Sequence, residues 1–188
     1  MHYEWKQLYS ELENCRRCSL CEERTSVVIG EGNTAASVML IGEGPGHDED
    51  LSGRPFVGPA GQLLDRMLAA IGLDRKQVYI ANVVKCRPPN NRTPSEGEAQ
   101  ACLPFVRAQF ALVGPQIIIC LGATAAKYVY DNNARITRDR GKWVQRKGVW
   151  ILPTYHPAAL LRDPSKKRDA WTDMQLLRDK INELSLEV

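Results

Sequence analysis

The chain has 188 residues, of which 44% are hydrophobic and 25% charged, and a formal net charge of +3. This length suits one domain over residues 1–188 that buries roughly 70% of its unfolded surface and needs no disulfides. The mild positive charge permits a nucleic-acid partner without requiring one. No apolar run reaches the ~18 residues of a membrane span and no secretory signal opens the chain, so we expect a cytoplasmic protein that does not bind a membrane.

Helices and buried strands are predicted to alternate along most of the chain. The N-terminal segment 3–14 has apolar residues at helical spacing, which predicts an amphipathic helix. Apolar runs predict strands at 38–41, 78–84, 116–121 and 149–154, and the intervening patterns predict helices at 62–68, 94–113 and 123–130. A last amphipathic helix is expected to contain Trp171, Met174, Leu176, Leu177 and Ile181. This order argues for a mainly parallel sheet covered on both faces.

The segment between the first strand and the next helix, residues 42–61, holds six glycines and three prolines. It leaves the carboxyl end of a buried strand, which is where open α/β sheets bind ligands. Its glycines do not match a dinucleotide fingerprint, Pro45 removes an N–H, and no Walker sequence is present, so a phosphate cradle is the weaker interpretation. A turn-rich loop with no ligand remains an alternative.

The six cysteines indicate metal ligands or buried apolar residues rather than disulfides in a reducing compartment. Cys120 ends a fully apolar run and is predicted to be a buried hydrophobic residue. Cys21 would extend a ferredoxin run, but no Cys-Pro follows, so we predict a partly buried thiol that is not a ligand. The remaining thiols suit either zinc or an iron–sulfur cluster, and their spacing leaves both open. They are Cys15, Cys18, Cys86 and Cys102.

Two basic segments interrupt the predicted elements. Residues 87–96 form a rigid basic loop in which Thr93 and Glu96 predict a capping box, with Pro94 at the first helical position. Residues 132–147 are rich in arginine and lysine and suit either a solvated surface loop or a binding patch.

Three motifs together resemble the uracil-DNA glycosylase superfamily, and in particular its iron–sulfur family 4. They are the glycine loop, the four cysteines and the segment 156–162, His-Pro-Ala-Ala-Leu-Leu-Arg. The similarity extends from Cys15 to Arg162. It implies a three-layer α/β/α sandwich with a central four-stranded parallel sheet. It also implies a structural [4Fe–4S] cluster, because the hydrolysis needs no electron, and its ligands would be Cys15, Cys18, Cys86 and Cys102.

The resemblance implies an enzyme that hydrolyses the N-glycosidic bond of uracil in DNA and leaves an abasic site, as in base excision repair. Such an enzyme must extrude the nucleotide or take single-stranded substrate. Phe56 is expected to stack on the base, and an ordinary core phenylalanine is the alternative. Asn82 is expected to pair with uracil O4 and N3–H and thereby reject cytosine, whereas a strand-end cap is the alternative.

The chemistry is expected to centre on His156, which would approach uracil O2 and stabilise the leaving anion; a structural histidine at a strand end is the alternative. Main-chain groups around Glu43 and Gly44 are expected to help. Gly44 occupies the position where the best-known relatives carry a water-activating aspartate, so Glu43 and Glu49 are the candidate bases. Glu49 is also expected near the pyrimidine edge, where bulk would exclude the thymine methyl group. His47 is expected to be peripheral.

The segment Leu160, Leu161 and Arg162 is expected to enter the minor groove and fill the vacated stack; an ordinary helix turn with inward leucines is the alternative. The expected partner is uracil-containing DNA, single- or double-stranded, bound by a monomer. A relative that traps uracil through a histidine is disfavoured, because residues 87–101 contain none. A noncatalytic iron–sulfur protein that binds nucleic acid remains a rival interpretation.

Overall fold

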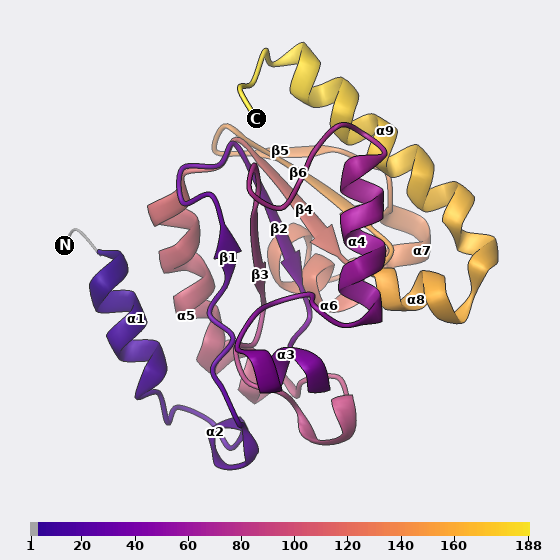
Figure 1. The fold of residues 1–188 in the computed structure, drawn as a ribbon. Coiled ribbons are helices and arrows are strands. Elements are labelled where there is room, and N and C mark those ends of the chain that lie inside the picture. The colour runs from indigo at the N-terminus through magenta and orange to yellow at the C-terminus, as the bar shows by residue number, and fades with distance from the viewer. Residues whose placement is uncertain (1–3) are drawn as a thin grey trace.

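A computed structural model describes residues 4–188, and Figure 1 shows its arrangement around one sheet. Tyr3, the first residue of the predicted N-terminal helix, lies outside the described residues. The six strands have the order β1-β3-β2-β4-β6-β5. Their bounds are Glu31–Gly32 for β1, Val38–Gly42 for β2, Tyr79–Asn82 for β3, Ile117–Leu121 for β4, Val144–Arg146 for β5 and Val149–Thr154 for β6.

The central strands β3, β2, β4 and β6 are parallel, which confirms the four predicted parallel strands, although the whole sheet has six strands. Two short antiparallel strands, β1 and β5, extend it at the edges. Sequence patterns missed both because they are two and three residues long and none of their residues is fully buried. An edge strand of this kind carries little apolar signal.

The helices lie on both faces of the sheet, as Figure 1 shows. Their bounds are α1 Trp5–Glu13, α2 Leu20–Glu23, α3 His47–Ser52, α4 Pro59–Ala69, α5 Glu96–Val113, α6 Ala123–Ala125, α7 Ile136–Asp139, α8 Pro157–Arg162 and α9 Lys167–Glu183. A π-helical turn, Ala126–Tyr130, continues α6, and short 3₁₀ turns occupy Pro89–Asn91 and Pro164–Lys166. No helix within residues 4–188 is long and apolar enough to span a membrane.

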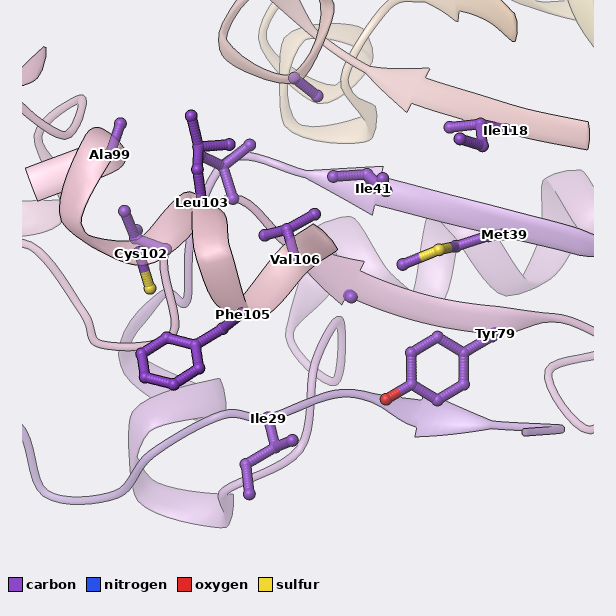
Figure 2. Packing of buried hydrophobic residues seen from close by; sticks show 14 of the residues in the cluster. Ile29, Met39, Ile41, Tyr79, Ala99, Cys102, Leu103, Phe105, Val106 and Ile118 are labelled. Atoms are coloured by element: carbon purple, nitrogen blue, oxygen red, sulfur yellow. The ribbon is translucent and has the colours of Figure 1, made fainter. Parts of the chain in front are cut away.

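Two apolar clusters fill the spaces between the sheet and the helices. Alternate strand residues such as Met39 and Ile41 pack under α1 and α5, and Figure 2 shows them facing Val106 of α5. The strand residues between them, such as Leu40, pack on the opposite face against α4 and α9. This alternation follows from the two-residue period of a strand and confirms the three-layer α/β/α arrangement.

Local details differ from the prediction at three places. The cap of α5 is Ser95, whose side chain accepts from the Glu98 N–H while Glu98 accepts from Ser95, so the capping box lies two residues beyond the predicted Thr93. The glycine loop contains the short helix α3, which the sequence pattern did not indicate. Trp171 of α9 is 40% exposed and does not belong to the buried face of that helix.

Candidate functional site

A cavity of about 600 Å³ opens at the carboxyl ends of the parallel strands. The strands β3 and β4 lie on opposite sides of β2, so this is a switch point of the sheet, where α/β proteins bind ligands. Seven of the predicted site residues, from three distant segments, line this cavity. They are Glu43, Gly44, Glu49, Phe56, Asn82, His156 and Arg162.

Phe56 is buried at 5% exposure, and its ring stacks on the imidazole of His156 with the centroids 5.5 Å apart and the planes at 29°. Its backbone φ of 53° is unusual for a bulky residue and requires support from its surroundings. Arg75 supplies that support, since its guanidinium donates to the carbonyl of Phe56 at 2.8 Å and to that of Pro55 at 2.6 Å. Arg75 is a positioning residue that sequence reasoning missed, because no motif contains it.

Asn82 ends β3 and is 1% exposed. Its Oδ1 is a buried side-chain atom with no hydrogen-bond partner in residues 4–188. An unpaired buried acceptor costs about 1–3 kcal/mol, so such an atom in a cavity indicates a place for a ligand donor. A strand-end cap would use this oxygen internally, which disfavours the structural alternative.

We expect Gly42→Ala to lower the free energy of unfolding by about 1–3 kcal/mol, the usual cost of overpacking. Gly42 is the neighbour of Asn82 in the parallel register, and an added Cβ would meet the Asn82 amide and the Phe56 ring closer than Cβ atoms approach other groups. Chemical denaturation measures the change. Gly97→Ala in α5 is the control, because an added Cβ there meets nothing within 4 Å. Unchanged stability of Gly42→Ala would contradict the close packing of Asn82 and Phe56 against Gly42.

His156 precedes α8, and its Nδ1 accepts from the Ala158 N–H at 3.1 Å. Burial lowers the pKa of His156 to about 4; the cation of Arg162 acts in the same direction and Glu49 opposes it. The imidazole is therefore neutral near pH 7. Because Nδ1 is an acceptor, the ring proton resides on Nε2, which makes His156 a neutral donor.

The two candidate bases have different environments. Glu49 accepts from the N–H groups of Val57 at 2.8 Å and Gly58 at 2.9 Å through Oε1, and from that of Gly46 at 3.1 Å through Oε2. Both of its oxygens thus hold the glycine loop together. The carboxylate of Glu43 accepts from the Thr124 hydroxyl across the switch point, between the ends of β2 and β4.

The segment after His156 forms α8, and only some of its side chains are exposed to solvent. Leu160 is 1% exposed and packs with Tyr155 in an apolar cluster. This corrects the expectation that Leu160 contacts DNA, because its side chain belongs to the core. Leu161 is 42% exposed, and Arg162 lines the cavity.

A second, small cavity gathers the thiols of the N-terminal arm, the segment after β3, and α5. It is lined by Cys15, Cys18, Cys21, Cys86 and Cys102 together with Arg17, Arg24 and Lys85. Arg24 Nη1 donates to the sulfur of Cys86 at 3.3 Å, and burial raises the pKa of the Cys102 thiol to about 11. Cys120 lies elsewhere and is fully buried, as predicted.

The thiols of the cysteine cavity are a donor set that zinc and iron–sulfur clusters both use. Within residues 4–188, no three His, Cys, Asp or Glu side chains are grouped so that they could hold a metal ion. A zinc ion draws four sulfurs to about 2.3 Å from one point. In a Cys-ligated [4Fe–4S] cluster each iron takes one thiolate, so the sulfurs need not converge on one centre.

Several arginines of the two basic segments form ion pairs with carboxylates of the protein itself. Arg92 makes a bidentate ion pair with Glu98 at 2.7 and 2.8 Å, which lowers the pKa of that carboxyl to about 2. In the segment 132–147, ion pairs hold Arg138 to Asp139, Arg140 to Asp173 and Arg146 to Asp131. These pairs disfavour a binding patch, and the predicted loop in fact contains the helix α7 and the strand β5.

Comparison with known proteins identifies the family of this chain. The chain belongs to the uracil DNA glycosylase superfamily, whose model matches residues 29–175. Within it the chain is similar to proteins named Type-4 uracil-DNA glycosylase. That of Thermotoga maritima is 47% identical over 87% of both chains. Those of Sulfurisphaera tokodaii and Archaeoglobus fulgidus are 44% and 43% identical over 93% of this chain, covering 83% and 89% of their own lengths.

Proposed function

We propose that the protein removes uracil from DNA by hydrolysing its N-glycosidic bond, which releases free uracil and leaves an abasic site for base excision repair. The observation that carries the proposal is the meeting of Phe56, Asn82 and His156 in one cavity. The names and the degree of identity of the relatives support the same activity. A noncatalytic nucleic-acid-binding protein would not need a buried unpaired amide oxygen beside a neutral histidine donor.

Recognition of uracil is assigned to Phe56 and Asn82. The Phe56 ring supplies the stacking surface, and the open Asn82 Oδ1 accepts from uracil N3–H while its Nδ2 donates to O4. Cytosine presents the opposite pattern, with an acceptor at N3 and a donor at position 4. An amide held in one orientation therefore leaves unpaired groups against cytosine, which is the strongest basis for rejection.

Asn82→Ala is expected to lower kcat/KM on a uracil-containing oligonucleotide by about 10–100-fold, since each lost buried hydrogen bond costs about 1–3 kcal/mol. Quantifying abasic-site formation after alkaline cleavage measures the effect. The matched control is Asn182→Ala, an exposed asparagine at the end of α9 that should leave the rate unchanged. Wild-type activity in Asn82→Ala would refute the proposal that the Asn82 amide recognises uracil, which we call its reading role.

Bond cleavage is assigned to His156 and the glycine loop. As the bond breaks, the Nε2–H of His156 donates to uracil O2, where negative charge develops. Main-chain groups at Glu43 and Gly44 line the same cavity and add to the stabilisation. Glu43 is assigned to orient the attacking water, whereas Glu49 positions the loop because its oxygens are already engaged. An oxocarbenium-like transition state needs little activation of that water.

Contact with duplex DNA is assigned to Leu161 and Arg162, since Leu160 is buried. Leu161→Ala is expected to lower kcat/KM about tenfold on duplex substrate and less than twofold on single strands. An apolar wedge compensates for unstacking, which a single strand does not require to the same degree. The single-stranded substrate is the internal control, and an equal loss on both substrates would contradict the wedge.

A [4Fe–4S] cluster held by Cys15, Cys18, Cys86 and Cys102 is proposed for the cysteine cavity. The Type-4 relatives and the gathering of these thiols support it. The cluster would supply a cross-link between the N-terminal arm, the segment after β3 and α5, because the hydrolysis itself needs no electron. Cys21 lines the same cavity and is proposed not to be a ligand.

The protein is further proposed to act in the cytoplasm as a monomeric single domain over residues 1–188. One chain supplies all the residues that the proposed chemistry uses, which supports a monomer. Sedimentation at assay concentration measures this directly, and a stable dimer would overturn it.

A further inference from the structure

Lys85 is a buried charged residue for which the proposed chemistry has no role. It is 1% exposed and lies between Asn82 at the end of β3 and the cysteine Cys86. An isolated ammonium is costly to bury unless its donors are all well paired. Within the described residues 4–188, its hydrogen-bond partners include no carboxylate.

The ammonium of Lys85 holds the backbone of Asn82, the residue proposed to recognise uracil. Its Nζ donates to the main-chain carbonyl of Asn82 at 2.7 Å and to Oε1 of Gln109 at 2.6 Å. Gln109 is itself fixed, because its Nε2 donates to the carbonyl of Ile29 at 2.7 Å and contacts the Tyr79 hydroxyl at 3.0 Å. Figure 2 shows the Tyr79 hydroxyl on the side of the sheet where Ile29 lies.

The backbone of Lys85 is tied to the cysteine cavity. Its N–H donates to the sulfur of Cys102, its carbonyl accepts from the Val28 N–H at 2.8 Å, and its side chain lines the cavity with Cys86. On the other side, the carbonyl oxygens of the Asn82 backbone and the Gln109 amide face the ammonium. Lys85 therefore contacts both the cysteine cavity and Asn82 at the end of β3.

We propose that Lys85 is a positioning residue that couples the cysteine cavity to the uracil-reading amide of Asn82. Its ammonium fixes the carbonyl of Asn82, and the side chain of Asn82 is thereby held in the orientation that accepts uracil. This inference rests on the proposed reading role of Asn82. A displacement of about 1 Å at such a residue costs up to about 10²-fold in rate, so a distant anchor has a measurable effect.

Lys85→Met tests the coupling, because methionine fills similar space and carries no donor. The dissociation constant of free uracil, measured by NMR titration of the purified protein, is expected to rise at least tenfold, and kcat/KM to fall by a similar factor. The matched control is Lys180→Met. Lys180 is also buried, but it lies over the Trp150 ring at 4.0 Å and pairs with Glu183, away from the cavity. It should change neither quantity more than twofold.

Gln109→Met keeps Lys85 but removes one of its acceptors, and about a threefold weaker binding of uracil is expected. If Lys85→Met shows no cooperative thermal transition and is therefore unfolded, the uracil affinity of Gln109→Met alone tests the coupling. Wild-type uracil affinity in the folded variants would overturn the coupling.

Asn82→Ala, titrated in parallel, separates the two ideas. If it loses uracil binding while Lys85→Met retains it, the coupling is wrong and the reading role stands. If Asn82→Ala also binds uracil normally, the reading role itself is wrong.

Discussion

Replacing His156 with alanine is expected to lower kcat for uracil excision by about 10²–10³-fold, the usual loss when one donor to a developing anion is removed. His156 donates from Nε2 because its Nδ1 is occupied by the Ala158 N–H. The donor is neutral, since burial lowers its pKa to about 4. Single-turnover measurements of uracil release separate this chemical step from product release.

His156→Gln is the informative companion, because glutamine retains an N–H donor. We expect it to recover part of the rate that His156→Ala loses, whereas a purely structural histidine would give similar losses in both variants. Comparable activity of His156→Ala and wild type would remove His156 from the mechanism and leave the main-chain donors as the source of stabilisation.

The same pKa predicts a pH dependence with a definite sign. In the unfolded chain His156 takes a proton near its ordinary value of 6.5, but in the folded protein only near 4. The unfolded state binds more protons between these values, so this group makes the protein less stable as the pH falls from about 6.5 to 4. His156→Gln should flatten that slope in denaturant titrations. Activity should show no loss from this group between pH 8 and about pH 5.

Strand periodicity placed Asn82 and His156 in or next to predicted strands, and the resemblance to the family selected them as site residues. Asn82 ends β3, and His156 follows β6, and parallel strands bring both to one edge. Phe56 was predictable only as a member of the glycine loop. Its positive φ and its stacking on His156 arise from contacts with Arg75, which is distant in sequence and belongs to no motif.

Other features depended on tertiary contacts that no local pattern records. Leu160 and Leu161 are equally apolar in sequence, and only the packing of α8 against Tyr155 separates the buried residue from the exposed one. Glu49 resembled a candidate base until its oxygens were found to hold the loop. The contact between Lys85 and Asn82 joins residues that are three positions apart in the sequence, and the sequence does not show that both are buried.

Loss of the proposed cluster is expected to have the largest effect on stability. Cys86→Ser and Cys102→Ser should each abolish an absorbance band at ~400 nm and lower the iron content of the purified protein. They should also lower the free energy of unfolding by about 2–5 kcal/mol, the size of effect seen when a covalent cross-link closing a long loop is removed. The thiols come from the N-terminal arm, the segment after β3 and α5, so their cross-link joins distant parts of the chain.

Two other cysteines provide controls that separate ligation from burial. Cys120→Ala removes a fully buried thiol outside the cysteine cavity, and should cost stability through packing while the absorbance band remains. Cys21→Ser changes a thiol within the cavity and should also retain the band. Loss of the band in Cys21→Ser, with its retention in Cys15→Ser, would exchange the ligand assignment of these two residues. One zinc per chain and no band in the wild type would replace the cluster with a single metal ion, and would require the thiols to close on one centre.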